Sequence, residues 1–182
     1  MNKRIPLFFK MTETKLSSEI VDRARKVTLL LMDCDGVLTD GRLYFNESGE
    51  AMKIFHVRDG QGLALWHQAG FRSGIISGRD AKKILEARAT ELGIDYIKTG
   101  SLEKAKDFED ILQDAKVTHD EVAYIGDDVG DISLLEKVGF PVAVSDSISE
   151  IDELVLYKTK TKGGLGAVRE VIDLLLRAKN SG

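Results

Sequence analysis

Apolar and polar residues alternate along this chain in blocks that switch between two periods. Short continuous apolar runs, such as residues 28–32 and 71–76, are typical of strands buried on both faces of a parallel sheet. Between them lie longer segments in which apolar residues recur every three or four positions, which is the helical period. Strands that alternate with such helices predict an α/β fold with a doubly wound, mainly parallel sheet and helices on both faces.

Start and stop signals divide the chain into short elements. Ser17 or Ser18 is the expected cap of the first helix and Asp59 that of the second. Helices are predicted over residues 18–27, 59–70, 80–92, 102–115, 131–138, 147–153 and 167–178. Strands are predicted over residues 28–32, 71–76, 95–98, 122–125, 141–144 and 154–157. Since no linker or repeat interrupts them, we expect one domain over residues 1–182, with a flexible N-terminus over about residues 1–14.

Residues 41–57 are expected to form a protruding β-hairpin. Residues 41–45 and 51–57 alternate between apolar and polar around residues 46–49, which are typical of a turn. Apolar side chains would occupy both faces: Leu43, Phe45, Met52, Ile54, Phe55 and Val57. A two-stranded hairpin with two apolar faces requires a covering surface, so we expect contacts with a neighbouring copy of the chain. Alternatively, one face packs on the domain body and the other stays exposed.

Composition narrows the class of protein. Apolar residues make up 43% of the 182 residues and charged residues 31%, a globular balance, and the net charge of −4 argues against a general nucleic-acid binder. Cys34 is the single cysteine, which excludes an internal disulfide and fits a reducing compartment. Since no apolar run approaches the ~20 residues of a membrane span or forms a signal peptide, we expect a cytoplasmic protein without a membrane partner.

Candidate chemistry gathers where predicted strands end. Asp33 and Asp35 follow the first strand, and side chains two residues apart on an extended backbone point to the same side. Their repulsion implies a shared proton or a bound cation. Ser77 and Gly78 follow the second strand with a hydroxyl and backbone amides suited to phosphate, and Lys104 lies on a later helix.

Three further carboxylates follow the strand at residues 122–125: Asp127, Asp128 and Asp131. Ligands of doubly wound sheets collect at the carboxyl ends of the strands, so these segments predict one site. Oxygen ligands without histidine or cysteine favour Mg²⁺. Taken singly, each segment could be an ordinary turn, helix cap or solvated lysine, but their joint arrangement favours a functional site.

These segments resemble, in order and spacing, the four motifs of the haloacid dehalogenase superfamily. Asp33-x-Asp35-Gly36-Val37-x-Thr39 is similar to the first motif, Ser77 to the second, Lys104 to the third, and Gly126-Asp127-Asp128-x-x-Asp131 to the fourth. The resemblance covers about residues 27–176. It implies a Rossmann-like phosphatase core.

The resemblance also implies roles for these residues. Asp33 would be the nucleophile that accepts the phosphoryl group, and Asp35 would protonate the leaving alkoxide and later activate water. Ser77 and Lys104 would bind phosphate oxygens. The implied ligands of Mg²⁺ are Asp33, the Asp35 backbone carbonyl and Asp127, supported by Asp128 and Asp131.

Members of this superfamily usually carry a cap domain over the site. Here the hairpin, one helix and one strand fill the segment between Asp35 and Ser77, and residues 99–101 leave no room before the Lys104 helix. We therefore expect a capless domain, whose substrate is large or whose site a neighbouring subunit closes.

A narrower resemblance is to the 3-deoxy-D-manno-octulosonate 8-phosphate phosphatase family of lipopolysaccharide synthesis. The similar segments are residues 38–41, 55–60, 77–79, 122–128 and 163–170. The resemblance implies a homotetramer formed through the hairpins, and a glycine-rich segment that can close over a neighbour's site. It implies that Gly78, Arg79, Arg58 and Gly164 contact the substrate. The Arg79 guanidinium suits the carboxylate of a sugar acid, although a surface arginine is the alternative.

Other functions would require different residues at particular positions. Phosphatases of nine-carbon sugar-acid phosphates carry Glu where this chain has Arg79, which favours the eight-carbon substrate. A phospho-accepting receiver domain would need an aspartate after the third strand, where this chain has Lys98-Thr99-Gly100. A catalytically silent assembly domain is not favoured, because all four motifs are intact.

Overall fold

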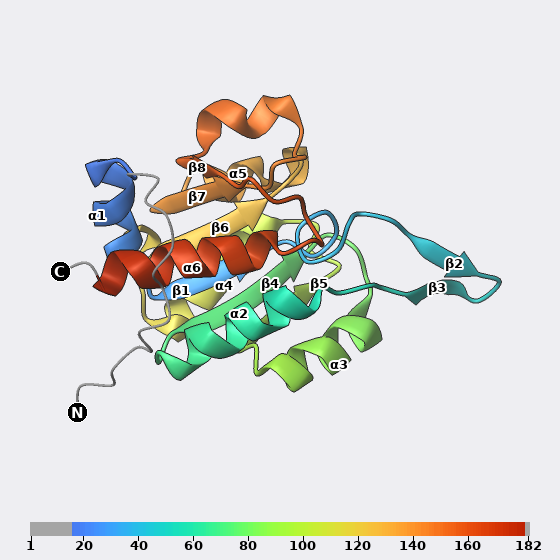
Figure 1. Cartoon of the computed structure of the whole chain (residues 1–182). Coiled ribbons are helices and arrows are strands. Elements are labelled where there is room, and N and C mark those ends of the chain that lie inside the picture. Colours follow the sequence, from blue (N-terminus) through green and yellow to red (C-terminus); the bar gives the residue numbers. More distant parts are fainter. Residues whose placement is uncertain (1–15, 181–182) are drawn as a thin grey trace.

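The computed structural model describes residues 16–180, so the expectation for residues 1–14 lies outside the described residues. Its centre is a six-stranded parallel sheet in the order β5-β4-β1-β6-β7-β8 (Figure 1). The strands are β1 (Leu29–Met32), β4 (Arg72–Ser77), β5 (Tyr96–Thr99), β6 (Val122–Gly126), β7 (Phe140–Ala143) and β8 (Tyr157–Lys158). From β1 the chain adds β4 and then β5 on one side of the sheet. It then crosses to the other side of β1 and adds β6, β7 and β8. This confirms the doubly wound sheet and places the switch point between β1 and β6.

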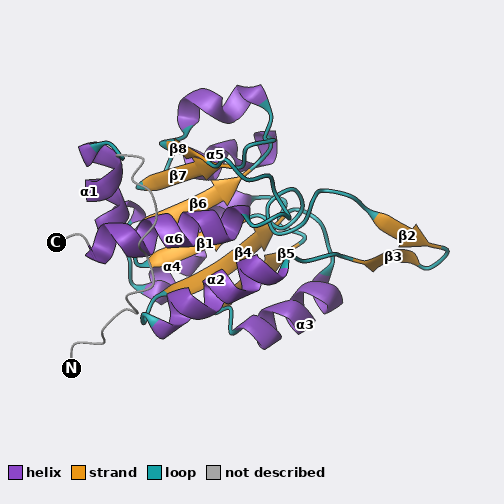
Figure 2. Ribbon diagram, viewed as in Figure 1, coloured by secondary structure: helices purple, strands orange, loops and turns teal. Residues whose placement is uncertain are grey.

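Helices cover both faces of the sheet, as the alternation of elements predicts (Figure 2). One face carries α1 (Ser18–Lys26), α2 (Val57–Gln68), α3 (Lys82–Leu92) and α6 (Ala167–Asn180). The other carries α4 (Lys104–Ala115), α5 (Ile132–Leu135) and the 3-10 helix η3 (Ser149–Leu154). Two short 3-10 helices, η1 (His119–Glu121) and η2 (Val129–Asp131), flank β6.

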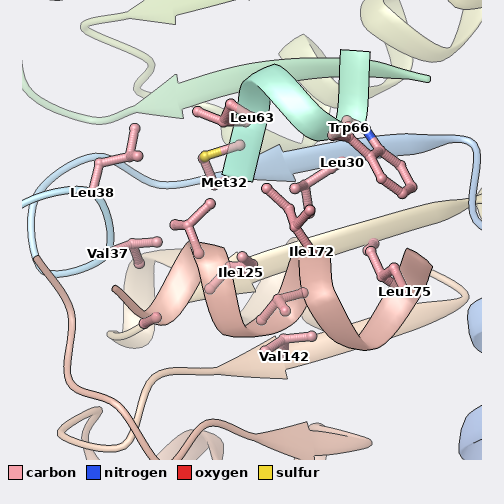
Figure 3. Packing of buried hydrophobic residues seen from close by; sticks show 14 of the residues in the cluster. Leu30, Met32, Val37, Leu38, Leu63, Trp66, Ile125, Val142, Ile172 and Leu175 are labelled. Carbon is pink, nitrogen blue, oxygen red and sulfur yellow. The ribbon is translucent and has the colours of Figure 1, made fainter. Parts of the chain in front are cut away.

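The alternation of side chains along β1 supplies both cores. Leu30 and Met32 face α2 and α6, where Trp66 and Leu175 close the layer (Figure 3). Leu29 and Leu31 face the opposite layer under α4. Each of these β1 side chains is fully buried and contributes about 1.5–3 kcal/mol to stability. The central strand is thereby fixed on both faces, and with it the loop that follows.

Several element boundaries differ from the sequence prediction. His56, not Asp59, caps α2, since its Nδ1 accepts a hydrogen bond from the backbone N–H of Arg58 at 3.2 Å. Val57 therefore begins the helix instead of ending the hairpin. The predicted helix over residues 131–138 is shorter and is preceded by η2, and β8 begins at Tyr157 because η3 occupies residues up to Leu154.

The hairpin consists of β2 (Tyr44–Asn46) and β3 (Gly49–Met52), which pair antiparallel and project beyond the sheet (Figure 1). Its apolar side chains stay in water in the single chain: Leu43, Phe45, Met52 and Ile54 are 45–61% exposed. Within residues 16–180, no cap domain covers the carboxyl end of the sheet, which confirms the capless fold. No helix among the described residues is both long and apolar enough to cross a bilayer.

Candidate active site

Three aspartates meet at the switch point of the sheet. Asp33 follows β1, and Asp127 and Asp131 follow β6; each offers a carboxylate oxygen within 4.8 Å of the others. The parallel pairing of the two strands brings them together, with Met32 opposite Ile125 and the backbone N–H of Asp33 donating to the Ile125 carbonyl at 3.0 Å. The strands end together, so the carboxylates are forced into one volume.

Lys104, at the start of α4, lies between two of these carboxylates. Its Nζ is 3.0 Å from Asp33 Oδ2 and 2.7 Å from Asp131 Oδ1, and its side chain is only 9% exposed. Burial alone would lower the pKa of Lys104, but Asp33 and Asp131 outweigh it and raise the pKa. The ammonium therefore stays charged and offsets part of the crowded negative charge.

Asp131 is saturated with hydrogen bonds. Oδ1 accepts from Lys104 Nζ and from the Tyr124 hydroxyl at 2.6 Å, and Oδ2 accepts from the backbone N–H groups of Asp127 at 2.9 Å and Asp128 at 3.3 Å. A carboxylate has about four lone-pair positions, so this one has none left for a further ligand. Asp131 therefore holds the loop and Lys104 in place.

Asp127 has the opposite character. Its Oδ1 is buried and has no hydrogen-bond partner, and a Cβ on Gly36 would lie 2.0 Å from its Oδ2. Burial first, then Asp131 and Asp33, raise the pKa of Asp127 to about 8. Burial and Asp131 raise the pKa of Asp33 to about 6, against the opposing effect of Lys104. An unpartnered carboxylate oxygen beside a second carboxylate fits a hard divalent cation such as Mg²⁺.

Asp35 turns toward the hairpin and away from the other aspartates. Its Oδ1 accepts from Lys53 Nζ at 2.5 Å and from the Thr39 hydroxyl at 3.4 Å, while Arg79 Nε lies 3.7 Å from its Oδ2. Cys34, between Asp33 and Asp35, is fully buried. Cys34 bends and residues 35–38 form a turn, so the extended backbone expected to point Asp33 and Asp35 to the same side is wrong.

Ser77 and Gly78 lie at the end of β4, beside β1. The Ser77 side chain is buried and its hydroxyl donates to the Arg79 carbonyl at 3.5 Å, a long hydrogen bond that leaves the group able to turn toward a ligand. Gly78 borders an open cleft of about 610 Å³, whose lining also includes Ser101 and Lys104. Most of its lining lies in residues 101–109, at and just before the start of α4.

Comparison with known proteins assigns this arrangement to a family. The profile of the haloacid dehalogenase-like hydrolases matches residues 79–172. The 3-deoxy-D-manno-octulosonate 8-phosphate phosphatase of Escherichia coli K12 is 41% identical over 164 residues, which cover 90% of this chain and 87% of that protein. This chain belongs to the 3-deoxy-D-manno-octulosonate 8-phosphate phosphatase family.

Solved structures of this phosphatase family share the fold. The enzyme of Yersinia pestis superposes with a TM-score of 0.87 at 39% identity, covering 91% of this chain and 89% of that chain. The enzyme of Moraxella catarrhalis, solved with a magnesium ion, a phosphate ion and the sugar acid, gives a TM-score of 0.85 at 36% identity over 89% and 92% of the two chains. The mostly parallel sheet with a separate hairpin is thus the fold of this phosphatase family.

Not every residue suggested by the family motifs lies beside Asp33. Gly164 packs on the loop behind it, where its N–H donates to the Val37 carbonyl at 2.9 Å and a Cβ would lie 2.4 Å from the Asp40 nitrogen. Arg58 is exposed at the start of α2, beside the glycine-rich turn. Asp128 is exposed as well, and its Oδ1 accepts from the Val129 N–H at 2.6 Å, which caps η2.

Three residues at the phosphatase site were not found from the sequence: Glu50, Lys53 and Tyr124. Lys53 had a signal, since it is a lone cation in the apolar run of residues 51–55. Tyr124 lies in a buried strand, and nothing in the local pattern distinguishes it from a core residue. Its contact with Asp131 depends on the turn that follows β6.

Binding of Mg²⁺ should strengthen as the pH rises from about 6 to about 8. Asp127 has a pKa of about 8 in the folded chain, so a cation that binds it displaces a proton in this range. When binding releases one proton, the dissociation constant of Mg²⁺ falls by up to about tenfold for each unit that the pH rises. Calorimetric titration in two buffers of different ionisation enthalpy would measure the released proton, and pH-independent binding without proton release would contradict the assignment.

Proposed function

We propose that this chain is a Mg²⁺-dependent phosphatase that hydrolyses 3-deoxy-D-manno-octulosonate 8-phosphate to the free sugar acid and phosphate. The observation that carries the proposal is the Asp33 carboxylate beside the buried Lys104 ammonium, next to the unpartnered oxygen of Asp127. Membership of the phosphatase family supports the substrate. We further propose that residues 1–182 form one domain, located in the cytoplasm.

Asp33 is the proposed nucleophile. The Cys34 N–H donates to Asp33 Oδ1 at 2.7 Å, which fixes the plane of the carboxylate. A carboxylate oxygen attacks phosphorus, the bond from phosphorus to the sugar oxygen breaks, and Asp35 gives its proton to that oxygen. Water then attacks the aspartyl-phosphate, Asp35 takes the proton, and phosphate leaves Asp33 with its carboxylate restored.

Lys104 and Ser77 are the proposed phosphate-binding side chains, with the Gly78 backbone beside them. The Lys104 ammonium is already desolvated and oriented by Asp131, so it offsets transition-state charge without reorganisation. Mg²⁺, held by Asp33, Asp127 and the Asp35 carbonyl and supported by Asp128 and Asp131, would neutralise phosphate charge that the carboxylates otherwise repel.

Arg79 is the proposed partner of the sugar-acid carboxylate. Its side chain is 43% exposed at the mouth of the site, and Glu50 and Asp35 hold it at 3.4 and 3.7 Å. A guanidinium at this place favours an anionic group on the substrate beyond the phosphate. Arg58 and Gly164 would reach the substrate from the glycine-rich turn and its neighbouring helix.

Asp33→Asn should lower turnover of the sugar-acid phosphate by about 10³-fold or more, because the amide cannot form the aspartyl-phosphate. Phosphate release measures the effect. Asp40→Asn, at an exposed carboxylate in the same loop that pairs with the Arg42 side chain, should stay within about twofold. Full activity of the Asp33→Asn enzyme would refute Asp33 as the nucleophile.

EDTA should remove activity and added Mg²⁺ should restore it.

The eight-carbon sugar-acid phosphate should be turned over faster than the nine-carbon one. Arg79→Glu should reduce kcat/KM for the eight-carbon substrate by about tenfold or more, since an ion pair is replaced by repulsion. Comparison of both substrates with both enzymes measures this preference. Comparable rates of the unmodified enzyme on the two sugars would refute the specificity assigned to Arg79.

The hairpin should carry the assembly of a homotetramer. Phe45 is 61% exposed and Met52 and Ile54 are each 53% exposed, an apolar surface that needs covering. Phe45→Glu should reduce the mass in light scattering, because an unpaired charge would be buried in the contact. Glu47→Gln at the hairpin turn should leave the mass unchanged. A monomeric unmodified protein would contradict the proposal.

A further inference from the structure

Lys53 stands apart from the other lysines of the described chain because its side chain is fully buried outside the phosphate site. It follows β3 directly and carries its ammonium back to the base of the hairpin, with an exposed fraction of 0% for the side chain. Its Nζ donates to Asp35 Oδ1 and lies 2.7 Å from Glu50 Oε1. A buried cation of this kind is retained only where carboxylates compensate it.

Four side chains form a closed ring of alternating charge. Lys53 joins Oδ1 of Asp35 to Oε1 of Glu50, and Arg79 joins Oε2 of Glu50 to Oδ2 of Asp35 at 3.4 and 3.7 Å. The two links to Asp35 differ. Lys53 makes a direct hydrogen bond, whereas Arg79 is within ion-pair distance only, and Oδ2 is buried without a hydrogen-bond partner.

We propose that Lys53 is a positioning residue that fixes the carboxyl group of Asp35 by one oxygen, so that the other oxygen carries the proton exchanged with the leaving group. This inference rests on the proposed phosphatase function and adds a residue to it. Lys53 touches neither phosphate-binding side chain, and its contacts are with Asp35 and Glu50. Because Oδ1 already accepts from Lys53 and Thr39, only Oδ2 is free to exchange a proton.

A residue that positions Asp35 should affect substrates differently according to their leaving group, whereas a residue that only stabilises the fold should not. A proton from Asp35 is needed when the leaving group is a basic alkoxide and is hardly needed when it is a nitrophenolate. Lys53→Met should therefore reduce kcat/KM by about 10- to 100-fold for an alkyl phosphate, within the ~10²–10⁴-fold that general acid catalysis supplies, and by under about threefold for p-nitrophenyl phosphate. The quantity kcat/KM includes the step that expels the leaving group.

The experiment uses the full-length enzyme with Mg²⁺ and a series of phosphate monoesters without carboxylates, from p-nitrophenyl through phenyl to an alkyl ester. Esters without carboxylates keep Arg79 out of the comparison. The sugar-acid phosphate is measured in parallel. Arg42→Met is the matched control, since it removes an exposed cation at the hairpin base that pairs with Asp40. Its dependence on the leaving group should equal that of the unmodified enzyme.

Two further variants keep the test sharp. Lys53→Gln retains a donor at the same place and should steepen the leaving-group dependence less than Lys53→Met. The glutamine variant also replaces the methionine variant in the test if the latter folds poorly. In an Asp35→Asn background, Lys53→Met should add under about twofold, because a residue that acts through Asp35 has nothing left to position.

The outcomes separate the two proposals. A steeper leaving-group dependence supports the role of Lys53. Equal losses on every ester overturn it and leave the phosphatase function intact. A steeper dependence together with no turnover of the sugar-acid phosphate supports Lys53 and refutes the proposed substrate, and an unmodified enzyme inactive on all esters refutes both.

Discussion

The crowding of carboxylates at one edge of the sheet is the constraint on which the site depends. Asp33, Asp127 and Asp131 lie within 4.8 Å of one another in a largely buried volume, where their mutual repulsion is weakly screened. The chain meets this in two ways. Lys104 supplies a fixed positive charge, and both oxygens of Asp131 accept hydrogen bonds from donors within the chain. The negative charge that these two groups do not compensate lies on Asp127 and Asp33, where a divalent cation can bind.

The hairpin contributes Glu50 and Lys53 to a second group of charged side chains beside the same site. The ring of Asp35, Glu50, Lys53 and Arg79 pairs two carboxyl groups with two cations, so the buried Lys53 ammonium is compensated at the base of a projecting element. The apolar tip of the hairpin and its charged base therefore have different tasks. The tip exposes apolar side chains, and the base contacts Asp35, the acid of the proposed mechanism.

The sequence predicts the sheet and the four site segments well, because both depend on local patterns. A buried strand followed by a polar turn identifies Asp33, Ser77 and Asp127, and a parallel sheet places such turns at one edge. The failures have tertiary causes. His56 caps α2 in place of Asp59, whose carboxylate instead accepts from the Arg169 N–H of α6 at 2.8 Å, a contact between distant parts of the chain. Lys53 and Tyr124 gain their partners in the same way, through turns that bring separate segments together.

The glycine-rich turn before α6 has a consequence for how the protein is made. Gly163 lies so close to the first acidic loop that a Cβ would come within 1.6 Å of the Gly36 carbonyl oxygen, and Gly164 donates to that loop as well. During synthesis on the ribosome all four motifs emerge before this turn exists. The loop that carries Asp33 and Asp35 then lacks its support from behind. The order of translation thus makes this support available only after every other segment of the site has been synthesised.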